Sequence, residues 1–259
     1  MNRTGLIVAL GIAIIVGLVF GVFPQLDLAI SQPFHDVFDI KHNQFAWRLY
    51  EPMVAARDWG LWIPALLVAP AVAAVLLKLA LPRRKMFMSG SAALFLIATM
   101  ALGPGLLVNV ALKEHWSRPR PIDVTTMGGD QHFVAWWDPR GDCPNNCSFV
   151  SGDVSGMAWT LAPAALMPPQ WRAIAYGGAL ALTIGMAVLR VMWGAHFFTD
   201  VVFAGVLTFL AIWFAYALIY RWPRTRLRED AVENALARLA IPGHDFIVGL
   251  FGGKKKPRP

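Results

Sequence analysis

Long apolar segments alternate with short polar ones along most of this chain. The first extends from Gly5 to Phe23 without a charged residue, and five more follow it. The six apolar segments are residues 5–23, 59–81, 86–112, 149–166, 173–189 and 197–220. Because a helix needs roughly 20 apolar residues to cross a bilayer, each segment predicts a membrane-spanning helix. The pattern therefore predicts an all-α, polytopic membrane protein with six transmembrane helices in a bundle.

The composition agrees with this prediction and excludes other classes of protein. Hydrophobic residues make up 57% of the 259 residues and charged residues only 15%, whereas soluble domains carry about 25% charged residues. Intrinsic disorder is excluded, because it requires low hydrophobicity and high charge. Pro24 and Gln25 follow the first segment in place of the small residues of a signal-peptide cleavage site, so we expect this segment to remain as the first span.

The basic residues predict the orientation of the spans. With a cytoplasmic N-terminus, fifteen of the 23 Lys and Arg residues fall on the cytoplasmic side, as the positive-inside rule requires. The net charge of +7 is then explained by topology and by anionic lipid headgroups, and no nucleic-acid partner is predicted. We expect a membrane domain over residues 1–220, with outer loops at about 24–58 and 113–150, and a cytoplasmic basic tail over residues 221–259.

Two polar segments show the apolar periodicity of helices that lie along a membrane surface. In the first outer loop the pattern covers residues 30–41, and in the tail it covers residues 232–239. Each is predicted to form a short amphipathic helix that covers an edge of the bundle.

The two cysteines, Cys143 and Cys147, lie four residues apart in the second outer loop. Oxidising conditions on the outer face favour a disulfide that braces the loop. A metal site is the alternative, but it would need further ligands, and only His132 is near in the sequence. The sequence predicts no metal site and no cofactor.

Three polar clusters lie at span ends, and the predicted topology puts all three on the outer face. They are residues 113–121, 148–153 and 190–200. Ionisable residues at such positions are costly to bury and therefore indicate function. In the third cluster His196 and Asp200 are four residues apart, so on a helix they share a face. The carboxylate can then hold one imidazole nitrogen and leave the other as a directed nucleophile or base. The alternative is a purely structural pair.

The other two clusters contain groups that suit a phosphate. Lys113, Arg120 and Arg190 are cations that match its tetrahedral oxygens, although binding to lipid headgroups is an alternative for such residues, Arg118 included. Ser151 and Gly152 stand where a helix is predicted to begin, and a helix N-terminus binds anions. The small glycine would let a ligand approach the backbone closely. Together these groups predict phosphoryl transfer.

The pattern K-x6-R-P, then S-G, then R-x5-H-x3-D resembles the signature of the type 2 phosphatidic acid phosphatases, the PAP2 family. The resemblance covers about residues 113–200 and includes the six-span layout. It points to the membrane lipid phosphatase branch and to similarity with lipid A 1-phosphatases. The resemblance implies that His196 is the nucleophile and forms a phosphohistidine, and that Asp200 orients it. It further implies that the phosphate is bound by the cations and helix start named above, without a metal: Lys113, Arg120, Ser151, Gly152 and Arg190.

Three positions depart from the family pattern. Val150 replaces a proline, Leu189 replaces a serine, and Asp153 stands where the family usually has a histidine general acid. Asp153 can act as the acid only if its environment keeps it protonated, and His115 and His132 are alternative donors. A leaving group that needs little protonation is a further possibility. It would favour the 1-phosphate of lipid A or a polyprenyl diphosphate as the substrate.

The sequence therefore predicts a lipid phosphatase in a bacterial inner membrane, with its active site facing the periplasm. Its expected partners are the membrane and a phospholipid, lipid A or polyprenyl diphosphate substrate, and vanadate is the expected inhibitor. Three alternatives remain: a lipid phosphotransferase, a transporter that binds anionic lipids without cleaving them, and an inactive relative that binds a partner.

Overall fold

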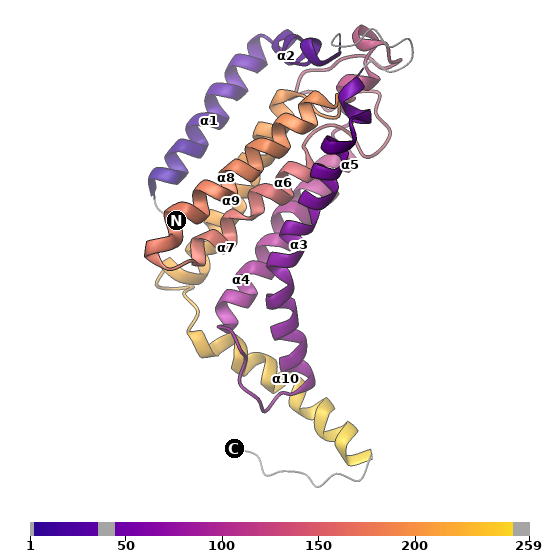
Figure 1. Cartoon of the computed structure of the whole chain (residues 1–259). Coiled ribbons are helices and arrows are strands. Elements are labelled where there is room, and N and C mark those ends of the chain that lie inside the picture. The colour runs from indigo at the N-terminus through magenta and orange to yellow at the C-terminus, as the bar shows by residue number, and fades with distance from the viewer. Residues whose placement is uncertain (1–2, 36–44, 251–259) are drawn as a thin grey trace. The chain divides into compact units, whose positions relative to one another are not determined.

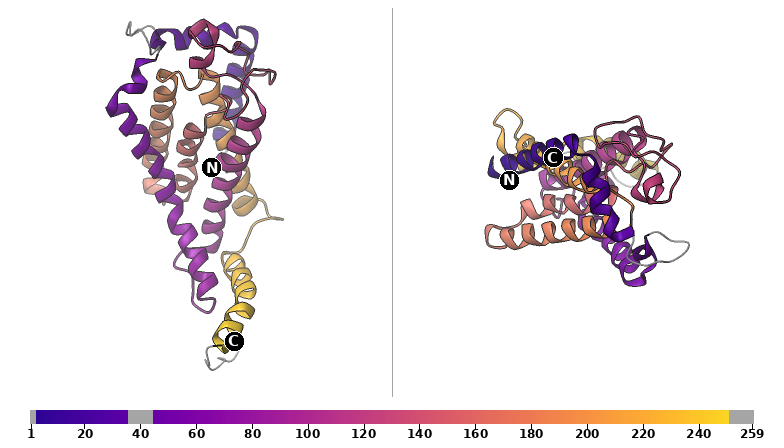
Figure 2. Two further views of the ribbon diagram at one scale, coloured as in Figure 1. Left: turned by 90° about the vertical axis from the view of Figure 1, so that its right-hand side faces the viewer. Right: turned by 90° about the horizontal axis from the view of Figure 1, so that it is seen from above.

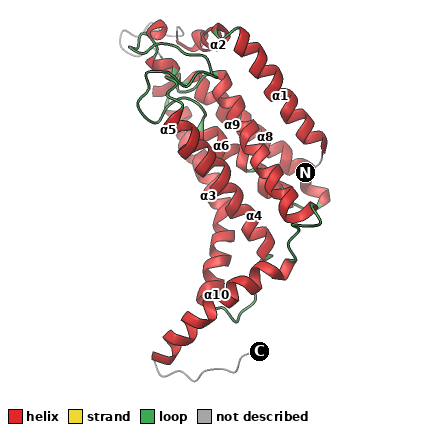
Figure 3. Cartoon of the chain, turned by 180° about the vertical axis from the view of Figure 1, so that it is seen from behind, coloured by secondary structure: helices red, strands yellow, loops and turns green. Residues whose placement is uncertain are grey.

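The computed structural model describes residues 3–35 and 45–250, and its regular structure is helical. No β-strand occurs among these residues (Figure 3). The α-helices are α1 Arg3–Val22, α2 Gln25–His35, α3 Glu51–Ala80, α4 Gly90–Met100, α5 Lys113–His115, α6 Gly152–Trp159, α7 Leu161–Leu166, α8 Pro169–Met192, α9 Phe198–Tyr216 and α10 Glu229–Leu250 (Figure 1). Shorter elements are the 3-10 helices η1 Ala46–Leu49, η3 Pro121–Asp123 and η4 Thr125–Met127, and the π-helical stretches η2 Ala101–Leu112 and η5 Ala217–Arg221. The prediction of an all-α fold is confirmed for the described residues.

The chain divides into two compact units. The first comprises residues 1–65 and 99–214, and the second comprises residues 66–98 and 215–259. All three polar clusters singled out in the sequence belong to the first unit.

Five helical segments of the described chain are long and apolar enough to cross a membrane. They are Arg3–Val22, Glu51–Ala80, Gly90–His115, Pro169–Met192 and Phe198–Arg221. Each overlaps one of the six apolar segments of the sequence. The second begins earlier than predicted, because the helix α3 already starts at Glu51.

The predicted span over residues 149–166 is not a single long helix, and the expected count of six therefore stays a prediction. It consists of α6 and α7, which are separated at Thr160. Pro163 has no N–H to donate to the carbonyl oxygen of Trp159, so a continuous helix would lose a hydrogen bond at this point. Instead the Thr160 hydroxyl donates to the carbonyl oxygen of Met157 at 2.6 Å. Both short helices are largely buried and pack against α8 (Figure 1).

One end of the first unit is formed by α2 and by the long loop between α5 and α6 (Figure 2). Aromatic side chains attach this loop to the helices below it. The ring centroid of Trp136 lies 4.5 Å from that of Phe203 on α9, and its Nε1 donates to the carbonyl oxygen of Gly17 on α1 at 3.3 Å. Phe149 is buried in the same cluster. The loop is therefore packed on α1 and α9 and can hold side chains in fixed positions.

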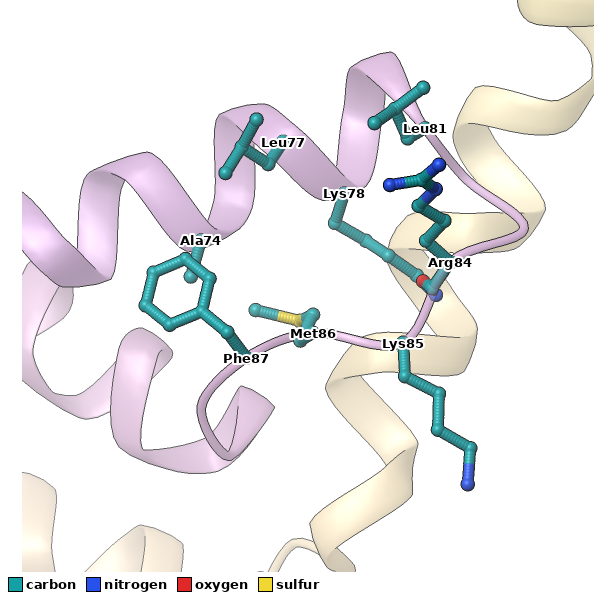
Figure 4. Close-up of a pocket in the computed structure, with 8 residues that line it drawn as sticks. All are labelled: Ala74, Leu77, Lys78, Leu81, Arg84, Lys85, Met86 and Phe87. Atoms are coloured by element: carbon teal, nitrogen blue, oxygen red, sulfur yellow. The ribbon is translucent and has the colours of Figure 1, made fainter.

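The second unit contains the helix α10, which is longer than the short helix predicted over residues 232–239. Glu233 of α10 accepts hydrogen bonds from the Lys78 ammonium at 2.9 Å and from the backbone N–H of Met86 at 3.1 Å. A cavity of about 230 Å³ lies beside Lys78 (Figure 4). Of the other predicted surface helix, residues 30–35 belong to α2, and residues 36–41 lie outside the described residues.

Candidate functional site

His196 lies in the turn that connects α8 to α9, and only 1% of it is exposed. The turn depends on Gly194, whose φ of +59° is a conformation that favours glycine. A Cβ atom at Gly194 would lie 2.5 Å from the ring of Phe45, so the close packing also excludes a side chain. Within the turn, the backbone N–H of Ala195 donates to the carbonyl oxygen of Arg190 at 3.1 Å. The turn thereby places His196 next to the end of α8, which carries Arg190.

The imidazole of His196 is held by a backbone carbonyl group, not by Asp200. Its Nδ1 lies 2.8 Å from the carbonyl oxygen of Ser148 and 4.0 Å from the nearer carboxylate oxygen of Asp200. The direct hydrogen bond expected between His196 and Asp200 is therefore absent. With Ser148 as acceptor, the proton is on Nδ1, and Nε2 is the nitrogen that carries the free lone pair.

Asp200 is turned away from the imidazole because stronger donors surround it. Its carboxylate accepts hydrogen bonds from the Ser148 hydroxyl at 2.5 Å, the Phe197 N–H at 2.8 Å and the Arg118 guanidinium at 2.5 Å. The Phe197 N–H lies at the start of α9, where free N–H groups and the helix dipole attract a carboxylate. Asp200 still affects His196, through the position of Ser148.

Arg118 and Asp27 are part of this site, although no motif in the sequence assigns them to it. Arg118 is fully buried and joins Asp200 to Asp27, with an Nη2–Oδ2 distance of 2.8 Å to the latter. The sequence suggested lipid headgroups for Arg118, and burial excludes that role. The one feature of the sequence that pointed to Arg118 was its position in the first polar cluster, residues 113–121. Asp27 lies about ninety residues earlier, and nothing in the local sequence links the two.

The three predicted phosphate-binding cations lie around His196. The pKa of His196 is well below its usual value, first because the ring is buried and then because Arg190, Arg120 and Lys113 repel a positive charge there. Burial also lowers the pKa of Arg120. The clusters are joined through the backbone, since the Cys147 N–H donates to the carbonyl oxygen of Lys113 at 3.0 Å. A neutral nucleophile surrounded by cations suits a phosphate ester.

Ser151 is the N-cap of α6, as the sequence predicted for the start of a helix. Its hydroxyl accepts from the Val154 N–H at 3.4 Å, and its own N–H donates to the carbonyl oxygen of Asp200 at 3.3 Å. Gly152 also has a packing role. A Cβ atom there would lie 2.7 Å from the side-chain oxygen of Asn109. The glycine is needed because α6 packs closely on η2.

Asp153 is hydrogen-bonded to Arg57 and forms an ion pair with Arg190. One carboxylate oxygen lies 2.9 Å from Nε of Arg57 and 3.4 Å from Nε of Arg190. A carboxylate placed between two guanidinium groups accepts hydrogen bonds and is poorly placed to donate a proton. Arg57, in the first turns of α3, is a further cation at the site, and it belongs to none of the three polar clusters of the sequence.

The alternative proton donors lie elsewhere. Nδ1 of His115 lies 3.1 Å and 3.0 Å from carbonyl oxygens of its own helical segment, and His132 is exposed and paired with Asp142 at 3.0 Å. In the described part of the chain, no hydrogen bond or ion pair links either ring to His196.

Cys143 and Cys147 are joined by a disulfide, with Cα atoms 5.8 Å apart. The loop that it closes holds Arg120, because the Asn146 carbonyl oxygen accepts from Nη2 of Arg120 at 2.7 Å. Among residues 3–35 and 45–250, no three His, Cys, Asp or Glu side chains gather as they would around a metal ion.

Comparison with known proteins relates this geometry to a family. The sequence profile of the PAP2 superfamily matches residues 92–224, which include every predicted site residue. A lipid A 4'-phosphatase of Francisella tularensis subsp. novicida (strain U112) is 30% identical over 223 residues, which are 85% of this chain and 98% of that protein. A lipid A 4'-phosphatase of Rhizobium leguminosarum is 41% identical over 106 residues, which are 41% of this chain and 46% of that protein.

A third relative, a lipid A 4'-phosphatase of Rhizobium etli (strain ATCC 51251 / DSM 11541 / JCM 21823 / NBRC 15573 / CFN 42), is 39% identical over 105 residues, 40% of this chain and 41% of that protein. No solved structure matches the chain. The family profile covers just over half of the chain, and the Francisella protein aligns along most of its length. The chain therefore belongs to the PAP2 superfamily, and it is a phosphatase of that family.

Proposed function

We propose that the protein removes the 4'-phosphate of lipid A, or of a closely similar phosphorylated glycolipid, at the outer face of a bacterial inner membrane. The observation that carries the proposal is the relationship to a lipid A 4'-phosphatase along 98% of that protein's length. The sequence favoured the 1-phosphate or a polyprenyl diphosphate instead. All three relatives are named as lipid A 4'-phosphatases, which favours the 4' position over these two substrates.

In the proposed reaction, Nε2 of His196 attacks phosphorus and displaces the sugar oxygen. The bond between nitrogen and phosphorus forms as the bond between phosphorus and the sugar oxygen breaks, and the leaving oxygen takes up a proton from the solvent. The water consumed in the next step returns a proton to the solvent. Water then cleaves the phosphohistidine, which releases inorganic phosphate and restores the imidazole. The 2.8 Å contact between Nδ1 of His196 and the Ser148 carbonyl oxygen supports this assignment, because it leaves Nε2 free.

The phosphate oxygens are bound by Lys113, Arg120 and Arg190, with help from the start of α6 at Ser151 and Gly152. These cations act at close range in a buried setting, where charge stabilisation of the transition state is strong. Their positions are fixed by backbone contacts, such as the Arg120 bond to Asn146. The bound oxyanion therefore requires little rearrangement of the protein.

Asp153 acts by neutralising Arg57 and Arg190 while the site holds no phosphate, and not as the proton donor. Its two guanidinium contacts, at 2.9 Å and 3.4 Å, support this role. A phosphate that enters the site competes with the Asp153 carboxylate for the same two cations. This competition limits how tightly the product phosphate binds.

The apolar acyl chains of such a lipid can stay in the bilayer while its headgroup reaches the site. The site lies at the ends of membrane-length helices, next to the loop between α5 and α6. The distribution of basic residues favours the periplasmic side for this end, since most Lys and Arg residues fall on the opposite side.

The direct test uses the purified protein in detergent with three lipids: lipid A phosphorylated at both positions, at position 4' alone and at position 1 alone. We expect inorganic phosphate from the first two and none from the third, with no release by the variant His196→Ala. Release from the 1-phosphate form alone would overturn the proposed position. Phosphate transferred to another lipid would indicate a phosphotransferase, and binding without cleavage would indicate a transporter. Vanadate, which mimics five-coordinate phosphorus, is expected to inhibit.

A further inference from the structure

Asp27 is buried in the first unit. Along the sequence it lies far from the motifs of the site. It lies on α2, outside the residues 92–224 that match the family profile, and only 1% of it is exposed. Its carboxylate accepts hydrogen bonds from the Thr199 N–H at 3.0 Å, the Thr199 hydroxyl at 2.6 Å and the Arg118 guanidinium at 2.8 Å. A carboxylate is expensive to bury, so this arrangement calls for an explanation.

Arg118 connects Asp27 to the catalytic region. The guanidinium donates to Asp27 from one terminal nitrogen and to Asp200 from the other, and its Nε donates to the Val134 carbonyl oxygen at 3.2 Å. Its carbon atom Cζ lies 4.5 Å above the centre of the Phe197 ring. The planar fork of an arginine is suited to such a bridge, whereas a lysine ammonium is a single point charge.

The chain of contacts ends at the imidazole. Asp200 accepts from the Ser148 hydroxyl, and the carbonyl oxygen of Ser148 holds Nδ1 of His196. One guanidinium is thus shared between two carboxylates, and the nearer one lies 4.0 Å from Nδ1 of His196. Buried networks of this kind restrict their members to one arrangement when every polar group is satisfied.

We propose that Asp27 is a positioning residue, which acts on His196 through Arg118 and Asp200. The inference rests on the proposed function, because during turnover His196 becomes positively charged when it takes up the phosphoryl group. Without Asp27, Arg118 would pair with Asp200 alone. It would then neutralise more of the negative potential that Asp200 creates at His196. With Asp27 in place, part of the Asp200 charge remains available to stabilise the positive ring of the phosphohistidine.

The test compares two variants of α2. Asp27→Asn keeps the size of the side chain and removes its charge, and we expect kcat to fall at least tenfold while KM for lipid A stays within twofold. Ser31→Ala is the matched control, because its buried hydroxyl donates to the backbone oxygen of Asp27 and not to the carboxylate. We expect Ser31→Ala to retain the wild-type kcat. Equal kcat values for Asp27→Asn and Ser31→Ala would overturn the proposal.

A double variant tests whether Asp27 acts through Asp200. If it does, adding Asp27→Asn to Asp200→Asn lowers kcat by less than a further twofold. The Asp200→Asn substitution has then already removed the charge through which Asp27 acts on His196. Independent, multiplicative losses would overturn the proposal. Should Asp27→Asn fail to fold, Arg118→Lys takes its place. This variant keeps the positive charge and removes the planar guanidinium that bridges the two carboxylates. A tenfold lower kcat at unchanged KM supports the proposal, and a wild-type kcat overturns it.

Histidine ¹⁵N NMR of the protein without substrate separates failure of this inference from failure of the proposed function. The His196 signals are identified by their loss in His196→Gln. We expect the Nδ1 signal of His196 to shift in Asp27→Asn and not in Ser31→Ala, whether or not the enzyme cleaves lipid A. Unchanged Nδ1 signals in an active Asp27→Asn enzyme would overturn the role of Asp27. Lack of phosphate release by the wild-type protein would overturn only the function.

Discussion

The side-chain hydroxyl of Ser148 donates a hydrogen bond of 2.5 Å to the carboxylate of Asp200. The carbonyl oxygen of the same serine holds Nδ1 of His196 at 2.8 Å. One residue thus couples the carboxylate to the imidazole, which themselves lie 4.0 Å apart.

Removing the hydroxyl in Ser148→Ala is expected to lower kcat about tenfold. A hydrogen bond to a charged group contributes about 1.5 kcal/mol, and about 1.4 kcal/mol corresponds to a factor of ten in rate. The measurement is phosphate release from lipid A at saturating substrate. Ser155→Ala is the control, because its buried hydroxyl bonds to that of Thr208 at 2.6 Å, away from the site. An equal loss in both variants would contradict the coupling.

The pH dependence should reflect the lowered pKa of His196. The ring is neutral, and therefore nucleophilic, down to pH values below the usual histidine range, so kcat/KM should fall only in more acid solution. The Arg120→Gln variant removes one of the charges that lower this pKa, which should move the acid limb to higher pH. Arg140→Gln, with 80% of its side chain exposed in the outer loop, is the control and should leave the limb in place. An acid limb unchanged by Arg120→Gln would contradict this electrostatic account.

The same group links stability to pH. The unfolded chain protonates its histidines near their usual pKa, whereas buried His196 binds a proton only in more acid solution. The folded state therefore loses stability as the pH falls below about 6.5, the ordinary histidine pKa.

The Asp153→Asn variant should bind inorganic phosphate more tightly. Without the carboxylate charge, Arg57 and Arg190 are free to pair with phosphate, and we expect its inhibition constant to fall about tenfold, which corresponds to about 1.4 kcal/mol. Asp58→Asn is the control, because its exposed pair with Arg57 should contribute little. If Asp153→Asn instead abolished turnover with unchanged phosphate binding, Asp153 would be the proton donor.

The disulfide should stabilise the loop that holds Arg120. Closing a loop of five residues lowers the entropy of the unfolded chain by an amount equivalent to about 2 kcal/mol. The double variant Cys143→Ser with Cys147→Ser should therefore have a Tm about 5 °C lower and a reduced kcat/KM. A reducing agent should reproduce both effects in the wild-type protein and leave the double variant unchanged. Equal Tm values in all samples would argue against a disulfide.

Features that depend on the local pattern of apolar residues could be predicted from the sequence. Five of the six apolar segments coincide with membrane-length helices, because length and hydropathy suffice to define a span. The segment 149–166 is different, since Pro163 and the Thr160 hydroxyl interrupt it without lowering its hydrophobicity. A window of hydropathy cannot detect such a break.

At the site, motif spacing led to Lys113, Arg120, Arg190 and His196, and the structure gathers them. The partners of these residues could not be predicted from the sequence, because the contacts join segments that are far apart along the chain. Asp27 and Arg118 are separated by 91 positions, and Arg57 and Asp153 by 96. The direct bond expected between His196 and Asp200 followed from helical spacing alone. It is absent because His196 lies in the turn before α9 and because Asp200 has charged and backbone donors nearer to it.

The central claim is that His196 carries the phosphoryl group during turnover. It is tested most directly by mixing the enzyme with 4'-³²P-labelled lipid A, quenching within the first turnover and locating the label by peptide mass spectrometry. The account predicts an acid-labile, base-stable phosphate on the peptide that contains His196, absent from His196→Ala. Rapid release of labelled phosphate by an enzyme that never carries the label on His196 would contradict it.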